Sequence, residues 1–185
     1  MNAFVVFKRS DGCTLRFFCR ASPEYSPHIC DEFPAVELVT PPLDGIILPG
    51  VTRDSVLALA REHAAGKSRV PDLTEKLVVS ERPVTMQEVK AAAQDGSLVE
   101  FFGTGTSSPS SVVVCMKKEE GLILGGWVAG TAAVISPVDR IGYLGEDLHI
   151  PTGPDGMGPV SRPLWKLLTA IQTGAVPHPW SVVVA

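Results

Sequence analysis

The 185-residue sequence lacks several features that would assign it to a common functional class. It has a formal net charge of −4 and no run of basic residues, which argues against a nucleic-acid-binding surface. The longest uncharged, apolar-rich stretch, residues 121–137, contains five glycines or prolines and is too short to span a bilayer. No signal or transit peptide opens the sequence, which says little if the sequence is part of a longer protein. We therefore expect neither a nucleic-acid nor a membrane partner.

Cysteine is scarce, and its spacing excludes the common metal and redox motifs. The four cysteines are Cys13, Cys19, Cys30 and Cys115. None of their separations matches a C-x-x-C pair, and the four histidines are too dispersed to complete a metal site. We interpret His149 as a structural residue, and no Ser-His-Asp set or pair of carboxylates suggests hydrolytic chemistry. The sequence thus predicts no metal ion and no hydrolase site.

The features that are present fit one globular domain. The composition is 45% hydrophobic and 19% charged, and sixteen prolines indicate many loops. Hydrophobic patterning predicts an α+β domain with a mainly antiparallel sheet or a barrel. The predicted strands are residues 2–7, 36–40, 76–84, 98–102, 131–136, 140–143 and 181–185. The predicted helices are residues 53–64, 86–95 and 160–173.

Residues at the ends of two helices support these limits. Thr85 and Glu88 form a capping box at the start of the helix at residues 86–95, and Gly96 is a natural stop. Thr52 is the expected N-cap of the helix at residues 53–64.

The most informative stretch is the turn that leads into the helix at residues 53–64. Three prolines restrict this turn, which delivers Gly50-Val51-Thr52 to the helix start. Such a start leaves backbone N–H groups free at the positive end of the helix dipole, which suits a phosphate group. A second stretch, residues 102–106, contains glycines and hydroxyls that could hold the same anion from another side. The alternative is simple helix capping, for which glycine and threonine are common.

Several segments, taken in sequence order, resemble the branched-chain amino acid aminotransferases. They are residues 1–7, 37–62, 81–86, 99–106, 132–143, 145–152 and 178–181. The phosphate loops alone would also fit a D-amino-acid transaminase or an aminodeoxychorismate lyase, but residues 81–86 and 178–180 favour the branched-chain group. The resemblance implies the larger, C-terminal cofactor domain of the fold that the D-amino-acid transaminases share (fold type IV).

The same resemblance implies a reaction, a cofactor and partners. The family uses pyridoxal 5′-phosphate to transfer an amino group between leucine, isoleucine or valine and 2-oxoglutarate. Its members are typically homodimers, and the implied location is the cytoplasm or the mitochondrion.

By resemblance, the phosphate of the cofactor would be bound by Val51 and Thr52 and by a Gly-Thr pair. That pair occurs twice here, as Gly105-Thr106 and as Gly130-Thr131. We place Thr131 slightly ahead of Thr106, because Ala132 follows Thr131 and matches the residue that borders the substrate carboxylate in the family.

The residues that carry the chemistry in the family have no match in this sequence. The lysine that binds the cofactor, the glutamate that pairs with its pyridine nitrogen and the smaller N-terminal domain all lie upstream of the position of Met1 in the family. The lysines here are Lys8, Lys67, Lys76, Lys90, Lys117, Lys118 and Lys166. None stands at the family position, so we assign no catalytic residue and expect a truncated form that is inactive alone. The alternative is a non-catalytic fragment or dimerisation module.

Two segments interrupt the resemblance, at about residues 13–35 and about residues 105–129, and all four cysteines lie within them. A short connection would be ordinary at the first. Removal of residues 105–129 or of residues 107–131 leaves a continuous sequence that follows the family pattern without interruption. We therefore interpret both segments as translated introns or gene-model errors in a eukaryotic gene, with real surface insertions as the alternative. Spliced transcripts that retain both segments would contradict the first interpretation.

Overall fold

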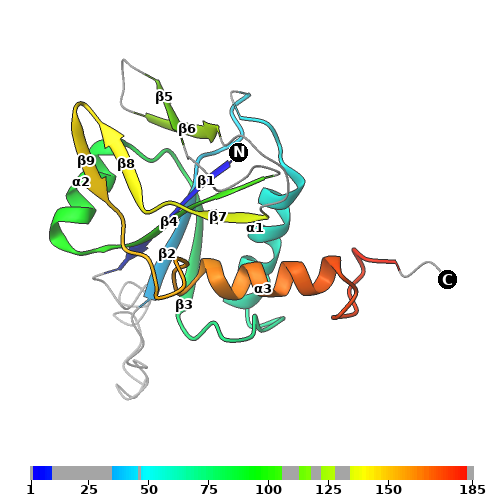
Figure 1. Ribbon diagram of the computed structural model, residues 1–185. Helices are drawn as coiled ribbons and strands as arrows, with labels where there is room; N and C mark the ends of the chain where they lie inside the picture. The colour runs from blue at the N-terminus through cyan, green and yellow to red at the C-terminus, as the bar shows by residue number, and fades with distance from the viewer. Residues whose placement is uncertain are drawn as a thin grey trace, which may run out of the picture.

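A five-stranded sheet forms the centre of the computed structural model, which describes residues 2–9, 35–45, 47–105, 113–117, 122–127 and 134–182. The strands follow the order β3-β2-β1-β4-β7 across the sheet (Figure 1). Their bounds are β1 Asn2–Lys8, β2 Ala35–Thr40, β3 Lys76–Glu81, β4 Leu98–Thr104 and β7 Ile135–Pro137. The predicted α+β class is confirmed.

The sheet is mixed and open. β1 is antiparallel to β2 and to β4, and β4 is antiparallel to β7. β2 and β3 are parallel, because helix α1 (Val51–Ala64) carries the chain from the end of one to the start of the other. The antiparallel majority agrees with the prediction, but the barrel alternative is wrong, since the sheet of the described residues ends at β3 on one side and at β7 on the other.

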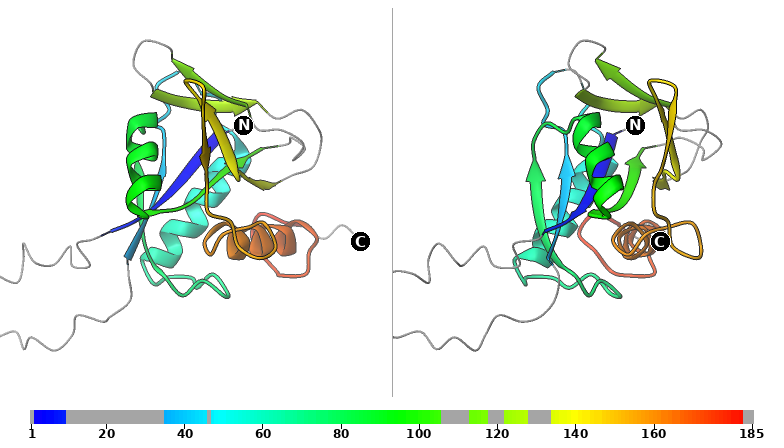
Figure 2. Two further views of the ribbon diagram at one scale, coloured as in Figure 1. Left: turned by 60° about the vertical axis from the view of Figure 1, so that its left-hand side comes forward. Right: turned by 90° about the vertical axis from the view of Figure 1, so that its left-hand side faces the viewer.

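Helices cover both faces of the sheet. Helices α1 and α3 (Ser161–Gln172) lie side by side, away from helix α2 (Met86–Asp95) (Figure 2). Along β1, Phe4 and Val6 point into the core with α1 and α3, whereas Val5 and Phe7 point into the core with α2. The ring of Phe4 stacks on Phe102 of β4 at 5.1 Å between centroids. Because both faces are covered, β1 is apolar on both sides and forms the middle of the molecule.

A two-stranded hairpin packs over the α2 side. It consists of β8 (Arg140–Tyr143) and β9 (Glu146–His149), and its turn residues Leu144 and Gly145 both have positive φ, at 52° and 82°. That conformation is typical of a tight hairpin turn. The predicted strand at residues 140–143 is confirmed.

A second hairpin lies inside the segment at residues 105–129 that interrupts the family resemblance. Its backbone forms the antiparallel strands β5 (Val113–Lys117) and β6 (Leu122–Trp127). The other interrupting segment, residues 13–35, lies outside the described residues except for Ala35.

Three sequence predictions about element ends are wrong. Helix α1 begins at Val51 with Gly50 as its N-cap, so Thr52 is already inside the helix and is not the cap. Strand β3 ends at Glu81, because Pro83 cannot continue the ladder. Ser181 and Val182 are not in a strand, and the remainder of that predicted strand lies outside the described residues.

Candidate functional site

The start of helix α1 is the candidate site, and its backbone is open. Gly50 has an extended conformation, with φ −78° and ψ 131°, and provides no side-chain cap. The first backbone hydrogen bond of the helix runs from the N–H of Asp54 to the carbonyl of Gly50, at 3.0 Å. Within the described residues, the N–H groups of Val51 and Thr52 thus remain without an acceptor. Free N–H groups at the positive end of a helix dipole favour an anion.

Asn2 of β1 lies against this helix start, and two buried hydroxyls lie on strands further across the same sheet. A methyl group on Gly50 would lie 2.6 Å from the side-chain nitrogen of Asn2, so a larger residue there would have to displace the Asn2 side chain. Asn2 begins β1 and lies directly opposite Thr104, near the end of β4. The Thr104 hydroxyl and that of Ser136 on β7 are buried and have no hydrogen-bond partner in the described part of the chain. Buried hydroxyls are normally bonded, so both can accept a polar ligand or a residue outside the described part.

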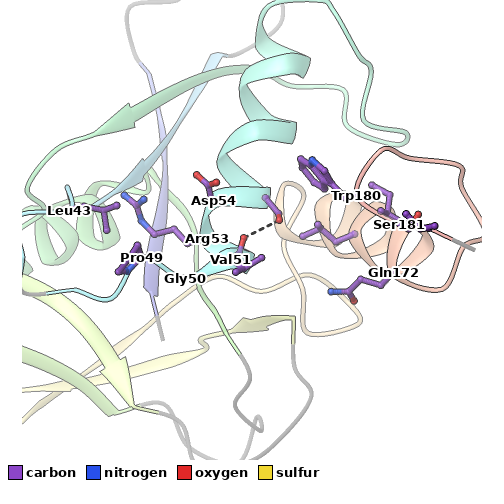
Figure 3. A pocket seen from close by; sticks show the side chains of 13 residues that line it. Leu43, Pro49, Gly50, Val51, Arg53, Asp54, Gln172, Trp180 and Ser181 are labelled. Atoms are coloured by element: carbon purple, nitrogen blue, oxygen red, sulfur yellow. Dashed lines mark hydrogen bonds between the residues drawn. The ribbon is translucent and has the colours of Figure 1, made fainter. Parts of the chain in front are cut away.

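A pocket of about 900 Å³ opens beside this helix start. One wall consists of Gly50, Val51, Asp54 and neighbouring residues, and the facing wall is made by α3 and the C-terminal segment (Figure 3). Leu168, Ile171 and Trp180 make the facing wall largely apolar. The Trp180 ring also contacts His178 edge-on and is 48% exposed, so it lines the pocket as well as packing on the C-terminal segment.

Arg53, in the first turn of α1, is buried and ion-paired. It is 2% exposed, and its Nη2 donates to the carbonyl of Pro41 at 2.9 Å and to the Glu81 carboxylate at 2.6 Å. Arg61 donates to the other oxygen of that carboxylate. The hydrogen bonds from Arg53 and then Arg61 lower the pKa of Glu81.

A buried carboxylate fixes helix α3, which forms the far wall of the pocket. Glu100 on β4 is 2% exposed and accepts hydrogen bonds from the N–H of Val160, at 2.8 Å, and from the N–H and hydroxyl of Ser161. Burial raises the pKa of Glu100, and the hydrogen bonds from Ser161 and Val160 oppose that rise. A Cβ on Gly158 would lie 2.1 Å from this carboxylate, so glycine is required there.

Sequence reasoning foresaw neither the buried bridge of Arg53 nor the role of Glu100. The signal for Arg53 was its position in a first helical turn, where a positive charge opposes the helix dipole and requires a partner. The signal for Glu100 was a charge inside an apolar strand. A register shift in the β1–β4 pairing leaves Val99 as an extra residue and turns Glu100 towards α3.

The structure brings only part of the predicted site together. Val51 and Thr52 lie at the start of α1, and Gly105 follows β4, where its N–H points to the carbonyl of Val134 at 3.4 Å. The other predicted site residues lie outside the described residues: Thr106, Gly130, Thr131 and Ala132. The arrangement fits the phosphate end of pyridoxal phosphate on one side, while the second side predicted from Gly130-Thr131 is not described.

The described residues provide no amine at this pocket. No lysine lines it. Three described lysines form hydrogen bonds away from the pocket. Lys8 donates to the carbonyl of Gly96, Lys90 donates to the carboxylate of Glu146 and Lys166 donates to the carboxylate of Asp72. The same part of the chain holds no group of three or more histidine, cysteine or acidic residues that could bind a metal ion. None of its helices combines the length and apolar character needed to cross a membrane.

Comparison with known proteins identifies relatives of one kind, although no protein-family model matches the chain. The chain is 37% identical over 149 residues to a branched-chain-amino-acid aminotransferase of Monosiga brevicollis. It is 38% identical over 149 residues to the mitochondrial enzyme of that name from Schizosaccharomyces pombe, and 40% identical over 145 residues to the mitochondrial enzyme from Mus musculus.

These similarities cover most of this chain but a minor part of each relative. They extend over 80%, 79% and 78% of this chain, but over only 29%, 27% and 28% of the respective relatives. The chain therefore spans less than a third of the length of these curated relatives. The resemblance found from the sequence motifs is confirmed, and the coverage is consistent with a C-terminal portion.

Proposed function

We propose that this chain, which is homologous to part of the branched-chain-amino-acid aminotransferases, is the part that binds the phosphate group of pyridoxal 5′-phosphate. The observation that carries the proposal is the open start of α1 beside a pocket of about 900 Å³. The names of the relatives favour this group over a D-amino-acid transaminase or an aminodeoxychorismate lyase. We further propose fold type IV and a homodimer for the complete enzyme.

In this proposal, backbone groups at two places hold the phosphate. The N–H groups of Val51 and Thr52 donate to its oxygens, and a Gly-Thr pair, either Gly105-Thr106 or Gly130-Thr131, closes the other side. Ala132 lies beside the carboxylate of the substrate. Each hydrogen bond to a charged group contributes roughly 1.5–3 kcal/mol, and the helix dipole adds roughly 0.3–1 kcal/mol. Two such bonds and the dipole predict weak binding of inorganic phosphate, with a Kd on the order of millimolar.

The complete reaction needs groups that we do not find at this pocket. When bound, pyridoxal phosphate withdraws electrons from the amino acid and so makes the amino-group transfer between leucine, isoleucine or valine and 2-oxoglutarate feasible. A lysine must bind the cofactor and move the proton. Because no lysine lines the pocket in the described part of the chain, we propose that these 185 residues alone bind the phosphate but do not transfer amino groups. Turnover of leucine by the purified chain would contradict this proposal.

A proline at position 51 tests the phosphate site directly. Val51 is the first helical residue, and proline is favoured at that position because its missing N–H has no helical partner. Gly50 already has the extended conformation that a residue before proline adopts. We expect Val51→Pro to weaken the binding of inorganic phosphate about ten-fold or more, since it removes one hydrogen bond to a charged group. Titration by calorimetry or NMR would measure this effect.

The matched control is Val51→Ala, which removes the same side chain but keeps the N–H. We expect its phosphate affinity to stay within about two-fold of the wild type. Equal affinities of the proline and alanine variants, with both folded by circular dichroism, would count against the proposed site.

A further inference from the structure

We propose that Arg53 is a positioning residue that pins the loop between β2 and α1 and so aims the first N–H groups of α1 at the bound phosphate. This inference rests on the proposed function of that helix start. Arg53 stands three residues after Gly50, and its guanidinium reaches back across the base of the loop to Pro41. One side chain thus connects the first residue after β2 to the first turn of the helix that follows.

The contacts place this guanidinium where two strands end. Thr40 and Glu81 are opposite each other at the ends of the parallel strands β2 and β3. Nη2 of Arg53 lies between the carbonyl of Pro41 and the carboxylate of Glu81, at 2.9 Å and 2.6 Å. The planar guanidinium can bond in two fixed directions at once, so it sets the helix start relative to both strand ends.

The described residues of this loop differ in how far they are buried. Leu43, Asp44, Gly45, Leu48 and Pro49 are all exposed, and Leu48 is 83% exposed. In contrast, Pro41 and Arg53 are buried at its base. The orientation of Gly50 and Val51 therefore depends on how the base of the loop is fixed.

Stability alone does not explain an arginine at this position. A positive charge in a first helical turn opposes the helix dipole. The Nε of Arg53 is buried without a hydrogen-bond partner among the described residues, and a buried ion pair is often no more stable than apolar residues of similar size. What an apolar residue could not provide is the directional bridge to Pro41 and Glu81.

Arg61 provides a matched control on the same helix. It binds the same Glu81 carboxylate, but its side chain is 52% exposed and no contact to the loop is found in the described part of the chain. Changing Arg61 therefore removes an arginine from Glu81 but leaves the contact to the loop in place. Changing Arg53 removes an arginine from Glu81 and also removes the contact to the loop.

The test compares Arg53→Met, Arg53→Lys and Arg61→Met in the 185-residue chain, with inorganic phosphate as the probe. We expect Arg53→Met to raise the Kd for phosphate about ten-fold, the effect of one misplaced hydrogen bond to a charged group. Amide hydrogen exchange in the loop should become faster in the same variant, above all at Asp44, whose N–H donates to the carbonyl of Pro42 at 3.1 Å. Arg61→Met should change the Kd by less than about two-fold and leave the loop amides unchanged. Arg53→Lys keeps the charge, but its side chain is shorter and lacks the planar Nη2 donor that bonds Pro41 and Glu81 together, so its loop amides should also exchange faster.

Two results would overturn the inference. One is a phosphate Kd in Arg53→Met that equals the Kd in Arg61→Met. The other is wild-type exchange of the loop amides in Arg53→Lys, which remains informative if Arg53→Met does not fold. Absence of phosphate binding by the wild type would refute the proposed function, and in that case the loop amides of Arg53→Lys alone would decide whether Arg53 pins the loop.

Discussion

Close approach decides which residues are possible at two places near the candidate site. Gly50 lies against the side chain of Asn2, and Gly158 lies against the carboxylate of Glu100. At each position a Cβ would meet an atom at less than 3 Å. The first contact brings β1 next to the start of α1, and the second seats the start of α3 on β4. These two close contacts therefore place the starts of α1 and α3, the helices that form the two walls of the pocket, against the sheet.

Charge at the base of the β2–α1 loop makes stability depend on pH. The hydrogen bonds from Arg53 and Arg61 lower the pKa of Glu81 in the folded chain. A lowered pKa means that the ionised carboxylate stabilises the fold above the unfolded pKa, about 4.3, and that this contribution is lost as the pH falls through the folded pKa. We expect the free energy of unfolding of the wild type to fall more steeply below about pH 4 than that of Glu81→Gln. Urea denaturation between neutral and acidic pH measures both, and parallel pH profiles would contradict this prediction.

At the scale of elements, helices α1 and α2 differ in how the N–H groups of their first turns are satisfied. The Thr85 side chain accepts a hydrogen bond from the N–H of Glu88 at 3.2 Å, so α2 has its own cap. The Glu88 carboxylate binds Arg82 at 2.8 Å. Helix α1 has no such cap, because its N-cap is Gly50. A helix start that keeps its N–H groups free is less stable by itself but can bind an anion.

This difference predicts unequal effects of two threonine substitutions. Thr85→Ala should lower the free energy of unfolding by roughly 0.5–2 kcal/mol, because it removes the cap of α2. Thr52→Ala should change it by less than about 0.5 kcal/mol, since Thr52 is not a cap. Chemical denaturation of both variants tests the pair, and a larger loss in Thr52→Ala would mean that Thr52 has a structural role not seen here.

Local signals in the sequence were enough to predict the helices. The Thr85–Glu88 pair marked the start of α2, Gly96 with φ 74° marked its end, and the buried face of α3 follows from the spacing of Leu164, Leu168 and Ile171. The start of α1 was placed two residues late, because Thr52 is a favourable cap residue by type and the geometry that makes Gly50 the cap depends on Asn2 of a distant strand.

Pairings between distant strands were harder to predict. The parallel pair β2–β3 was missed, although the order strand, helix, strand is typical of a parallel crossover. The sequence predicted a helix start with free N–H groups, and Gly50 provides no side-chain cap there, but the fixing of that start was not foreseen. The Arg53 bridge joins residues 12 and 28 positions apart, and the Glu100 contacts join β4 to α3 across 60 positions or more. Such contacts depend on the sheet order and not on any local pattern.

For the whole molecule, the pocket is bordered by apolar side chains that are largely exposed. Val51 and Val182 are each 84% exposed, and Leu43 and Trp180 are each 48% exposed. All four residues line the pocket. A cofactor site normally encloses most of its ligand, and this pocket is open. Together with the coverage of less than a third of each relative, this openness supports the proposal that the chain contributes one side of the site.

The most direct test of this account is an NMR titration of the uniformly labelled, 185-residue chain with inorganic phosphate. We predict that the backbone amides of Val51 and Thr52 show the largest shifts, because their N–H groups donate to the anion. Amides at the start of α2, which Thr85 already caps, should stay unchanged and serve as the internal control. A folded chain in which phosphate shifts neither Val51 nor Thr52 would contradict the central claim that the start of α1 binds the phosphate group.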